Sequence, residues 1–157
     1  QLESLPVQKT VRDVLADLAP EAEAADVELR TEIDEDLKCW SDRRGLYRVI
    51  RNLVDNAIKY NRPDGWVEVR GFSEDGKPVI EVEDNGEGSP SGELRAVLQR
   101  FYRVDRARTP GDGGLGLGLA IVKHMVQALG GTLELDSREG VGTTVTLRLL
   151  PTLDETG

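Results

Sequence analysis

The sequence predicts an α+β fold, a two-layer sandwich in which three main helices cover one face of a mixed, mostly antiparallel sheet. Some segments show the 3.6-residue apolar period of amphipathic helices, and others show the strict alternation of half-buried strands. Their order is helix, two strands, helix, hairpin, a charged flap, helix and hairpin. This order holds more strands than the winding of a parallel α/β sheet supplies, so a mixed sheet is expected.

The composition is that of one globular domain of 157 residues with a formal net charge of −9. A chain of this length buries a core without disulfide bridges, and its single cysteine, Cys39, excludes an internal disulfide. No apolar stretch approaches the ~20 residues of a membrane helix. The acidic balance argues against nucleic acid as the main partner, because a phosphate backbone binds to a basic surface. It does not argue against a nucleotide, since a local basic cluster decides whether a phosphate binds.

The first third of the chain is predicted to contain one helix and two strands. Residues 1–8 are expected to form a connector or an edge strand, because a proline there limits any ladder. Residues 8–25 carry a helical apolar stripe that is interrupted near Pro20. Residues 27–33 alternate as a half-buried strand does, and residues 37–40 form a second strand after an acidic turn.

Residues 41–61 are predicted to form the central amphipathic helix, capped by Ser41 or Asp42. One apolar face recurs with the helical period at Leu46, Ile50, Leu53 and Ala57. A polar stripe beside it carries Arg48, Asn52, Asn56 and Lys59. A carboxamide oxygen suits magnesium, and a lysine suits the phosphates that accompany magnesium. Taken alone, however, the stripe is better explained as a solvated helix face.

The second half of the chain is predicted to contain two hairpins, two helices and a flap. The flap, residues 103–116, is charged, contains Pro110 and four glycines, and has almost nothing to bury, so it is predicted to be mobile. The tail, residues 152–157, is polar and is expected to be disordered. The predicted elements are strands 66–72 and 79–83, a short helix 93–102, a helix 120–129, and strands 132–136 and 143–149.

Asp84-Asn85-Gly86-Glu87-Gly88 follows directly on a strand that is predicted to be central. A carboxylate at a strand end can accept a hydrogen bond from the amino group of adenine, and the glycines let a flat ring approach the main chain. An ordinary Asp-Asn-Gly turn explains the same residues equally well. Downstream, a cluster of arginines is either a phosphate clamp or a solvated basic loop. Its members are Arg95, Arg100, Arg103, Arg106 and Arg108.

The run of glycines and leucines over residues 113–120 leads straight into a predicted helix. Glycines before a helix N-terminus expose amide donors to an anion, with the helix dipole behind them. The run is not a P-loop, because no Gly-Lys-Ser or Gly-Lys-Thr occurs. It is not a dinucleotide fingerprint either, because Ile121 stands where the third glycine is required.

Together, these motifs resemble the catalytic, ATP-binding domain of sensor histidine kinases, in the wider superfamily of gyrase-type ATPases, Hsp90 and MutL. The resemblance spans about residues 6–151 and implies a Bergerat-type ATP-binding fold, with the whole of 1–157 as one domain and residues 103–116 as its ATP lid. Five motifs carry it. They are the N box over residues 52–60, the first glycine box 84–88, the F box 100–105, the second glycine box 114–119 and a last glycine box 140–144.

The resemblance implies that the ligand is ATP with Mg²⁺. Asn56 would bind the metal, and Asn52 would bind the phosphates or support the metal. Lys59 and Arg103 would contact phosphate, so that Asn52, Lys59 and Arg103 form the catalytic set.

For the adenine end, the resemblance implies that Asp84 accepts the amino group, that Tyr60 stacks nearby and that Thr143 acts through water. Glycines and leucines of the boxes would complete the binding site, with Gly116 and Gly118 donating backbone amides to phosphate. These further positions are Gly86, Gly88, Gly114, Leu115, Gly116, Leu117, Gly118 and Leu119. Ser89 and Leu115 depart from the usual pattern, and we expect altered lid packing with an intact site.

The resemblance also implies partners. The γ-phosphoryl group would pass to a histidine on a dimerisation and phosphotransfer domain, expected N-terminal to residue 1, and then to a response regulator. That domain would form the homodimer, and without it no autophosphorylation is expected. The only histidine, His124, lacks the acidic neighbour of a phosphoacceptor. The domain would be cytoplasmic and would meet a membrane only through its parent, in the manner of an inner-membrane sensor.

Three other functions stay open at this point. An ATPase of the same superfamily would need a glutamate at the position of Asn52 to activate water, so slow hydrolysis is expected. A serine kinase of the anti-sigma type is a second alternative. From another class, the chain could be a nucleotide-sensing interaction module without transfer activity.

Overall fold

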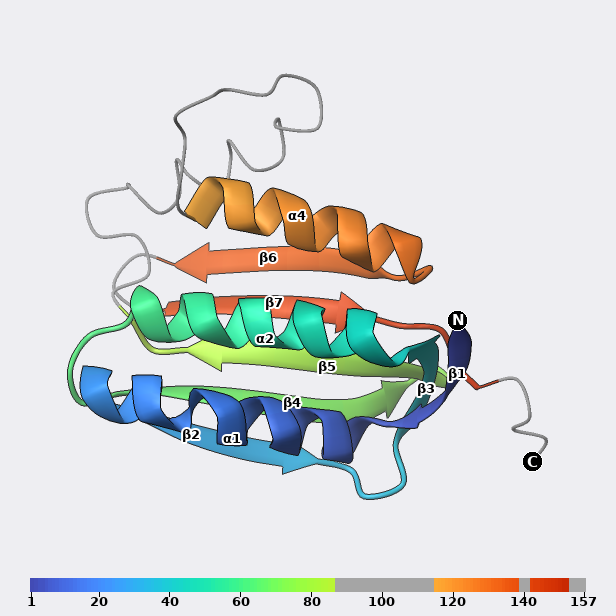
Figure 1. Ribbon diagram of the computed structural model, residues 1–157, viewed down its shortest axis with the longest axis horizontal. Coiled ribbons are helices and arrows are strands. Elements are labelled where there is room, and N and C mark those ends of the chain that lie inside the picture. The colour runs from blue at the N-terminus through green and yellow to red at the C-terminus, as the bar shows by residue number, and fades with distance from the viewer. Residues whose placement is uncertain (87–114, 139–141, 153–157) are drawn as a thin grey trace.

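The computed structural model describes residues 1–86, 115–138 and 142–152, and it has the predicted α+β architecture (Figure 1). In chain order its elements are β1 Leu2–Pro6, α1 Val7–Ala25, β2 Val27–Ile33, β3 Lys38–Asp42, α2 Arg43–Lys59, β4 Gly65–Glu74, β5 Lys77–Asp84, α4 Leu115–Ala128, β6 Thr132–Arg138 and β7 Gly142–Arg148.

The main sheet has five strands in the order β2-β4-β5-β7-β6. Only the β2–β4 pair is parallel, and the other three pairs are antiparallel, so the predicted mixed sheet is confirmed. β5 lies at its centre, between β4 and β7. A second sheet joins β1 to β3, and residues 2–6, expected to be a connector or an edge strand, are therefore a strand.

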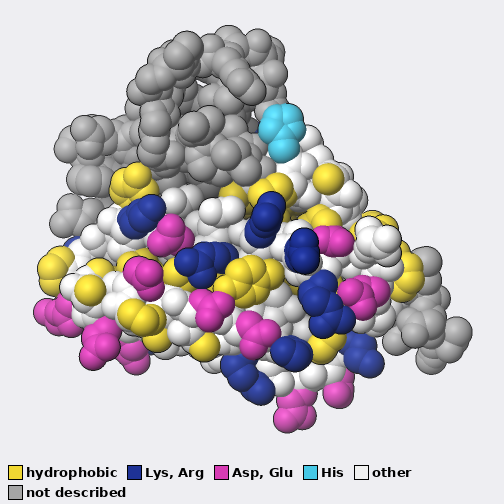
Figure 2. Space-filling model, in the orientation of Figure 1, with side chains coloured by type: hydrophobic (Ala, Val, Ile, Leu, Met, Phe, Trp, Pro, Cys, Tyr) yellow, Lys and Arg dark blue, Asp and Glu magenta, His cyan; other side chains and the backbone are white. Residues whose placement is uncertain are grey.

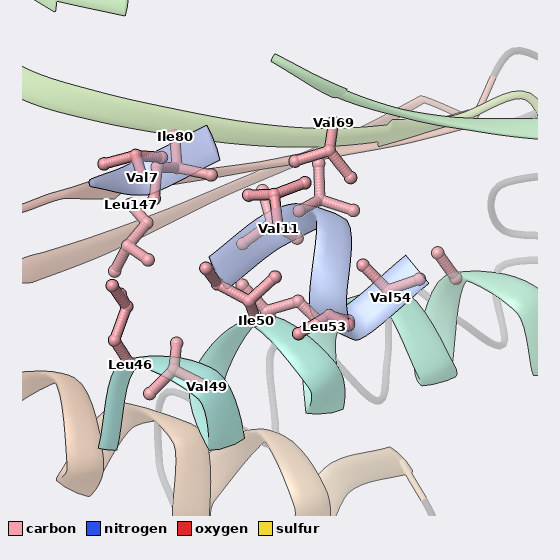
Figure 3. Packing of buried hydrophobic residues seen from close by; sticks show 14 of the residues in the cluster. Val7, Val11, Leu46, Val49, Ile50, Leu53, Val54, Val69, Ile80 and Leu147 are labelled. Carbon is pink, nitrogen blue, oxygen red and sulfur yellow. The ribbon is translucent and has the colours of Figure 1, made fainter. Parts of the chain in front are cut away.

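The three described helices lie on the same face of the main sheet (Figure 1). Their apolar stripes meet the inward side chains of the strands, and a group of these residues is shown in Figure 3. The predicted apolar face of α2 is confirmed, because Leu46, Ile50, Leu53 and Ala57 are all buried. This packing holds α2 rigidly, so the polar stripe beside the apolar face has a fixed position relative to β5.

The structure decides one open point in each of the two long helices. α1 runs through Pro20 without interruption, which corrects the expected break. Leu18 and Ala22 are buried on either side of the proline, while Pro20 itself and Ala16, whose carbonyl loses its amide partner, are exposed to water. α2 begins after Asp42, whose carboxylate accepts the Gly45 amide at 2.7 Å, so Asp42 is the cap.

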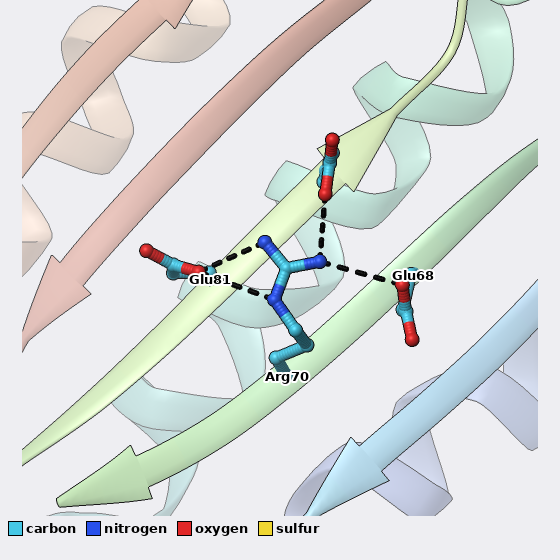
Figure 4. A network of polar contacts seen from close by, with 4 residues as sticks. Glu68, Arg70 and Glu81 are labelled. Atoms are coloured by element: carbon cyan, nitrogen blue, oxygen red, sulfur yellow. Dashed lines mark hydrogen bonds and ion pairs between the residues drawn. The ribbon is translucent and has the colours of Figure 1, made fainter.

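The face of the sheet opposite the described helices holds a network of charges (Figure 4). The Arg70 guanidinium lies 2.6 Å from Glu83, 2.8 Å from Glu81 and 3.3 Å from Glu68. Since side chains alternate along a strand, Glu83 points to this face and Asp84 to the helix face. The helix-covered face carries acidic and basic side chains interspersed over α1 and α2 (Figure 2).

The remaining predictions concern the second half of the chain. α4 begins at Leu115 rather than at residue 120, because Gly116 and Gly118 of the second glycine box are part of the helix. The predicted helix 93–102, residues 103–114 of the predicted lid and residues 153–157 of the tail lie outside the described residues. None of the helices within the described ranges is long and apolar enough to cross a membrane.

Candidate functional site

Three elements end or begin at the same edge of the fold (Figure 1). These are the last turn of α2, the C-terminal residue of β5 and the first turn of α4. α2 and α4 pack side by side, and a methyl group placed on Gly45 near the start of α2 would lie 3.1 Å from Leu129, just past the end of α4. The two helices are therefore antiparallel, and this brings the glycine box of α4 towards the C-terminal half of α2.

The α2 residues predicted to bind metal and phosphate lie on the partly exposed side of that helix. Asn52 and Asn56 are half-buried, one helical turn apart. Lys59 is exposed and forms an ion pair with Asp55 at 3.3 Å. Tyr60 caps the C-terminus of the helix and leaves 46% of its surface exposed, so its ring is accessible at this edge.

Asp84 is the last residue of β5 and lies between two strands. It is opposite Val67 of β4 and Thr143 of β7. Its carboxylate accepts the Gly86 amide at 2.9 Å and also a hydrogen bond from the backbone of Thr143. Burial raises the pKa of Asp84 to about 6, the two backbone hydrogen bonds oppose this rise, and the charge of Glu83 adds to it. A carboxylate in this position still has acceptor capacity for a further donor.

Two glycines allow the main chain to close around Asp84. A methyl group on Gly86 would lie 3.0 Å from the Tyr60 carbonyl oxygen, so the turn after β5 touches the end of α2. Gly142 has a φ of +140°, and a methyl group there would lie 2.0 Å from the Asp84 carbonyl oxygen. Thr143 follows Gly142 and is buried beside Asp84. Asp84, Gly86, Tyr60 and Thr143 are thus brought together.

The second glycine box lies in α4 itself. Its backbone over residues 115–119 forms the first helical turn, rather than a loop ahead of it as predicted. The first amides of a helix have no partner within the helix, and the amide of Gly116 is one of these. Three predicted site residues, Gly88, Arg103 and Gly114, lie outside the described residues, as does Ser89.

The donor set suits magnesium bound together with a nucleotide. No group of three or more His, Cys, Asp or Glu residues that could hold a metal ion occurs in the described part of the chain. The carboxamide oxygen of Asn56 is a hard ligand of the kind that Mg²⁺ accepts. Since Mg²⁺ commonly takes one or two protein ligands and completes its shell with phosphate oxygens and water, one asparagine fits the ion.

Sequence reasoning missed three residues of this edge. Asn61 was predicted only as the last residue of the central helix, and Asn85 and Gly142 were placed in glycine boxes without a role of their own. Asn61 and Asn85 both contact the main chain of Trp66 at the start of β4. The signal that could have found them is a carboxamide directly after a helix and another directly after a strand, because asparagine at such places hydrogen-bonds to nearby main chain.

A hollow of about 740 Å³ lies at the other end of the sheet, where β5 begins. Its lining includes Asp34, Glu35 and Asp36 from the β2–β3 turn and Pro78 of β5. Three carboxylates would repel a polyphosphate, and none of the predicted site residues contributes to it. The hollow is therefore not a second candidate for the nucleotide.

Comparisons with known proteins show the family to which the chain is similar. Residues 41–153 match a family model described as histidine kinase-, DNA gyrase B- and HSP90-like ATPase. Sensor histidine kinase WalK of Bacillus subtilis is 45% identical over 118 residues, which cover 74% of this chain but only 19% of WalK. The chain thus spans about a fifth of that relative.

Solved structures give the same result. The mycobacterial sensor histidine kinase MprB superposes with a TM-score of 0.75 and 29% identity, covering 97% of this chain and 100% of that one. Full-length ShkA, solved in complex with AMPPNP, superposes with a TM-score of 0.76 and 25% identity, covering 95% of this chain and 31% of that one.

Proposed function

The chain belongs to the family of histidine kinase-, DNA gyrase B- and HSP90-like ATPases, and we propose that it is the part of a sensor histidine kinase that binds Mg-ATP and transfers its γ-phosphoryl group to a histidine. The observation that carries this proposal is the half-buried carboxylate of Asp84, which ends the central strand next to the C-terminus of α2.

At the adenine end, the ionised Asp84 carboxylate accepts the hydrogen bond of the 6-amino group. A purine without that group offers no donor there, so the carboxylate selects adenine over guanine. Tyr60 supplies an exposed ring at the edge of the same site, and Gly86 leaves room for the base because it has no side chain. Buried Thr143 lies directly across the sheet from Asp84 and completes this end.

At the phosphate end, the residues neutralise and orient charge. Asn56 holds Mg²⁺, which offsets the negative charge of the phosphates when it is bound. Asn52 and Lys59 of α2, Arg103 of the lid and the amides at the start of α4 bind the phosphate oxygens. Phosphoryl transfer is catalysed mainly by positioning and charge stabilisation, and these groups supply both.

The phosphoryl acceptor is a histidine outside this chain. An unprotonated ring nitrogen attacks the γ-phosphorus, the bond to the bridging oxygen breaks and ADP leaves. His124 is an exposed residue of α4, a helix that itself contributes to the proposed phosphate site, and it lacks the acidic neighbour of a phosphoacceptor, so we do not assign it as the acceptor. The acceptor lies on a dimerisation domain of the parent protein, which then passes the group to a response regulator.

The relatives support this choice over the alternatives. The name of WalK is that of a sensor histidine kinase, and ShkA was solved with the ATP analogue AMPPNP. An ATPase needs a general base on α2 to activate water, and Asn52 is not a base. A histidine nitrogen needs no such activation, which favours transfer over hydrolysis.

The test uses ATP that carries a radioactive γ-phosphorus. The chain is mixed with the dimerisation domain of its own parent protein, supplied as a separate polypeptide. We expect a labelled acceptor domain whose phosphate is lost in acid and kept in alkali, as a phosphoramidate is. An acid-stable label would indicate a serine kinase, released phosphate alone would indicate an ATPase, and ATP binding without either would indicate a sensing module. Each of these three results contradicts the proposal.

A further inference from the structure

The main chain of Trp66 is held by two asparagines that come from different elements. Its carbonyl oxygen accepts the Asn61 side-chain amide at 3.1 Å and the Asn85 backbone amide at 3.3 Å. Its own amide donates to the Asn85 side-chain oxygen at 2.7 Å. Both acceptor sites of the Trp66 carbonyl and the single backbone donor of the same residue are therefore used. We call the contacts of Asn61 and Asn85 with Trp66 the carboxamide clasp.

The carboxamide clasp joins the two halves of the nucleotide site. Asn61 follows Tyr60 at the C-terminus of α2, and Asn85 follows Asp84 at the end of β5. The Asn61 side chain is oriented by the Arg62 amide, which donates to its oxygen at 2.8 Å. Its nitrogen is thereby directed at Trp66. A methyl group on Gly65 would lie 2.1 Å from the Asn61 oxygen, so the side chain sits tightly against the start of β4.

Asn85 allows β5 to end at Asp84 without losing its last ladder contact. In an antiparallel pair, the Trp66 amide would donate to a backbone carbonyl of the neighbouring strand. The Asn85 side-chain oxygen takes that place, so the main chain is free to turn away. This turn places the Gly86 amide 2.9 Å from the Asp84 carboxylate and brings Gly86 against Tyr60 and Asn61.

We propose that Asn61 and Asn85 are positioning residues of the nucleotide site, which hold the Gly86 amide on the Asp84 carboxylate and fix that carboxylate relative to the last turn of α2. Neither side chain reaches the base or the phosphates through these contacts, and both act through Trp66 and Gly86. The inference rests on the proposed function, because it takes Asp84 as the acceptor of the adenine amino group.

A positioning role and a purely structural role predict different pH dependences of ATP affinity. Loss of the clasp releases the Gly86 amide, which is one of two backbone donors that stabilise the charged form of Asp84. Glu83, the titratable neighbour whose charge acts on Asp84, points to the other face and keeps its contact with Arg70. The pH below which ATP affinity falls should therefore move upwards in clasp variants. Destabilisation elsewhere would leave that pH unchanged.

The experiment measures binding of a fluorescent ATP analogue and of tripolyphosphate, each with Mg²⁺, between pH 5 and 8. Asn85→Ala removes the acceptor of the Trp66 amide, and we expect its affinity for the ATP analogue to fall about 3- to 10-fold at pH 7.5. We also expect the pH midpoint of binding to rise, while tripolyphosphate affinity stays unchanged. Asn61→Ala removes one hydrogen bond only and should show a smaller change in the same direction.

Two controls make the result decisive. Gly76→Ala destabilises the turn at the far end of β5, where a methyl group would meet nothing within 4 Å, and should bind both ligands as the wild type does. Asn85→Asp keeps an oxygen for the Trp66 amide and should recover most of the affinity loss at pH 7.5. If Asn85→Ala does not fold by circular dichroism, Asn61→Ala carries the test.

Failure of this inference is distinguishable from failure of the proposed function. Suppose that Asp84→Ala changes the affinity for the ATP analogue, while both clasp variants match the wild type in affinity and in pH midpoint. The positioning role is then wrong, and the adenine site is unaffected. If the wild type binds tripolyphosphate and the ATP analogue equally and Asp84→Ala changes neither, the proposed adenine site itself is wrong.

Discussion

Gly142 lies directly against the main-chain carbonyl of Asp84, so that a methyl group on Gly142 would stand 2.0 Å from that oxygen. Only glycine fits, since its φ of +140° also disfavours any side chain. This contact brings Thr143 onto the Asp84 carboxylate from the β7 side, while Gly86 approaches it from the β5 side. Three separate close approaches of the main chain, at Gly142, Thr143 and Gly86, therefore surround Asp84.

Gly142→Ala tests the closeness of this approach. The variant suffers both an unfavourable φ and an atomic overlap, so we expect its free energy of unfolding to fall by roughly 3 kcal/mol or more. Gly76→Ala is the matched control, because Gly76 has a φ of +80° but free space around it, and only the backbone cost of about 1 kcal/mol applies. Urea denaturation measures both. Equal losses would show that the overlap is relieved at no cost.

The pKa of Asp84 predicts how stability depends on pH in the free protein. Its value is about 6 in the folded chain against an ordinary value of 3.8, so between these pH values the folded state keeps a proton that the unfolded state releases. The contribution of Asp84 to stability is therefore largest below pH 4 and is lost as the pH rises through 6, by about 3 kcal/mol in all.

Comparing the wild type with Asp84→Asn isolates this contribution from those of the other carboxylates. We expect Asp84→Asn to be more stable than the wild type at pH 7 and the two to converge towards pH 4. Thermal unfolding at several pH values provides the measurement. If the stability difference between the two proteins does not vary with pH, burial does not raise the pKa of Asp84 and this account of the carboxylate is wrong.

Asn56→Ala tests the magnesium site. If the Asn56 oxygen is the protein ligand of the metal, the variant should bind ATP with affinities that agree within about twofold in Mg²⁺ and in EDTA, while the wild type binds more tightly in Mg²⁺. Calorimetry in the two buffers gives the comparison. Arg51→Ala, on the same helix, is the control and should keep the magnesium dependence. An undiminished magnesium effect in Asn56→Ala would remove that residue from the site.

Arg70 lies on the sheet face opposite the described helices, so we expect its removal to lower the free energy of unfolding and to leave ATP affinity unchanged. Arg70→Ala leaves three partly buried glutamates to repel one another, and we expect a loss of about 1–3 kcal/mol. Arg148→Ala breaks a more exposed pair with Glu74 and should cost less than about 1 kcal/mol. Denaturation and ATP titration of both variants are the measurements. A change in ATP affinity in Arg70→Ala would indicate that the nucleotide contacts the Arg70 face of the sheet, which contradicts the proposed site.

The sequence was sufficient for most of the fold, because the core of each element follows from local periodicity. The apolar stripe of α2 and the alternation of β2 and β4 depend on neighbours in the chain and were predicted within a few residues. The continuation of α1 through Pro20 was not predicted, since it depends on burial of Leu18 and Ala22 by other elements. The pairing of β1 with β3 was not predicted either, because it joins two segments that lie far apart in the sequence.

The residues proposed for the site follow from local motifs in the sequence, whereas their arrangement in space does not. The order of the motifs indicated Asp84, Asn52 and Asn56 because each motif is local in sequence. The carboxamide clasp of Asn61 and Asn85 on Trp66 joins three segments, and no local sequence pattern predicts such a contact. The burial that raises the pKa of Asp84 is likewise a product of packing between strands.

The most direct test of the adenine site is a calorimetric titration of Mg-ATP into the wild type and Asp84→Ala at pH 7.5. Glu83→Ala, the neighbouring carboxylate on the opposite face, is the matched control. Loss of a charged hydrogen bond to adenine costs roughly 1.5–3 kcal/mol, so we expect affinity to fall about 10- to 150-fold in Asp84→Ala and to be unchanged in Glu83→Ala. An Asp84→Ala variant that binds Mg-ATP as tightly as the wild type would contradict the assignment of Asp84 to adenine.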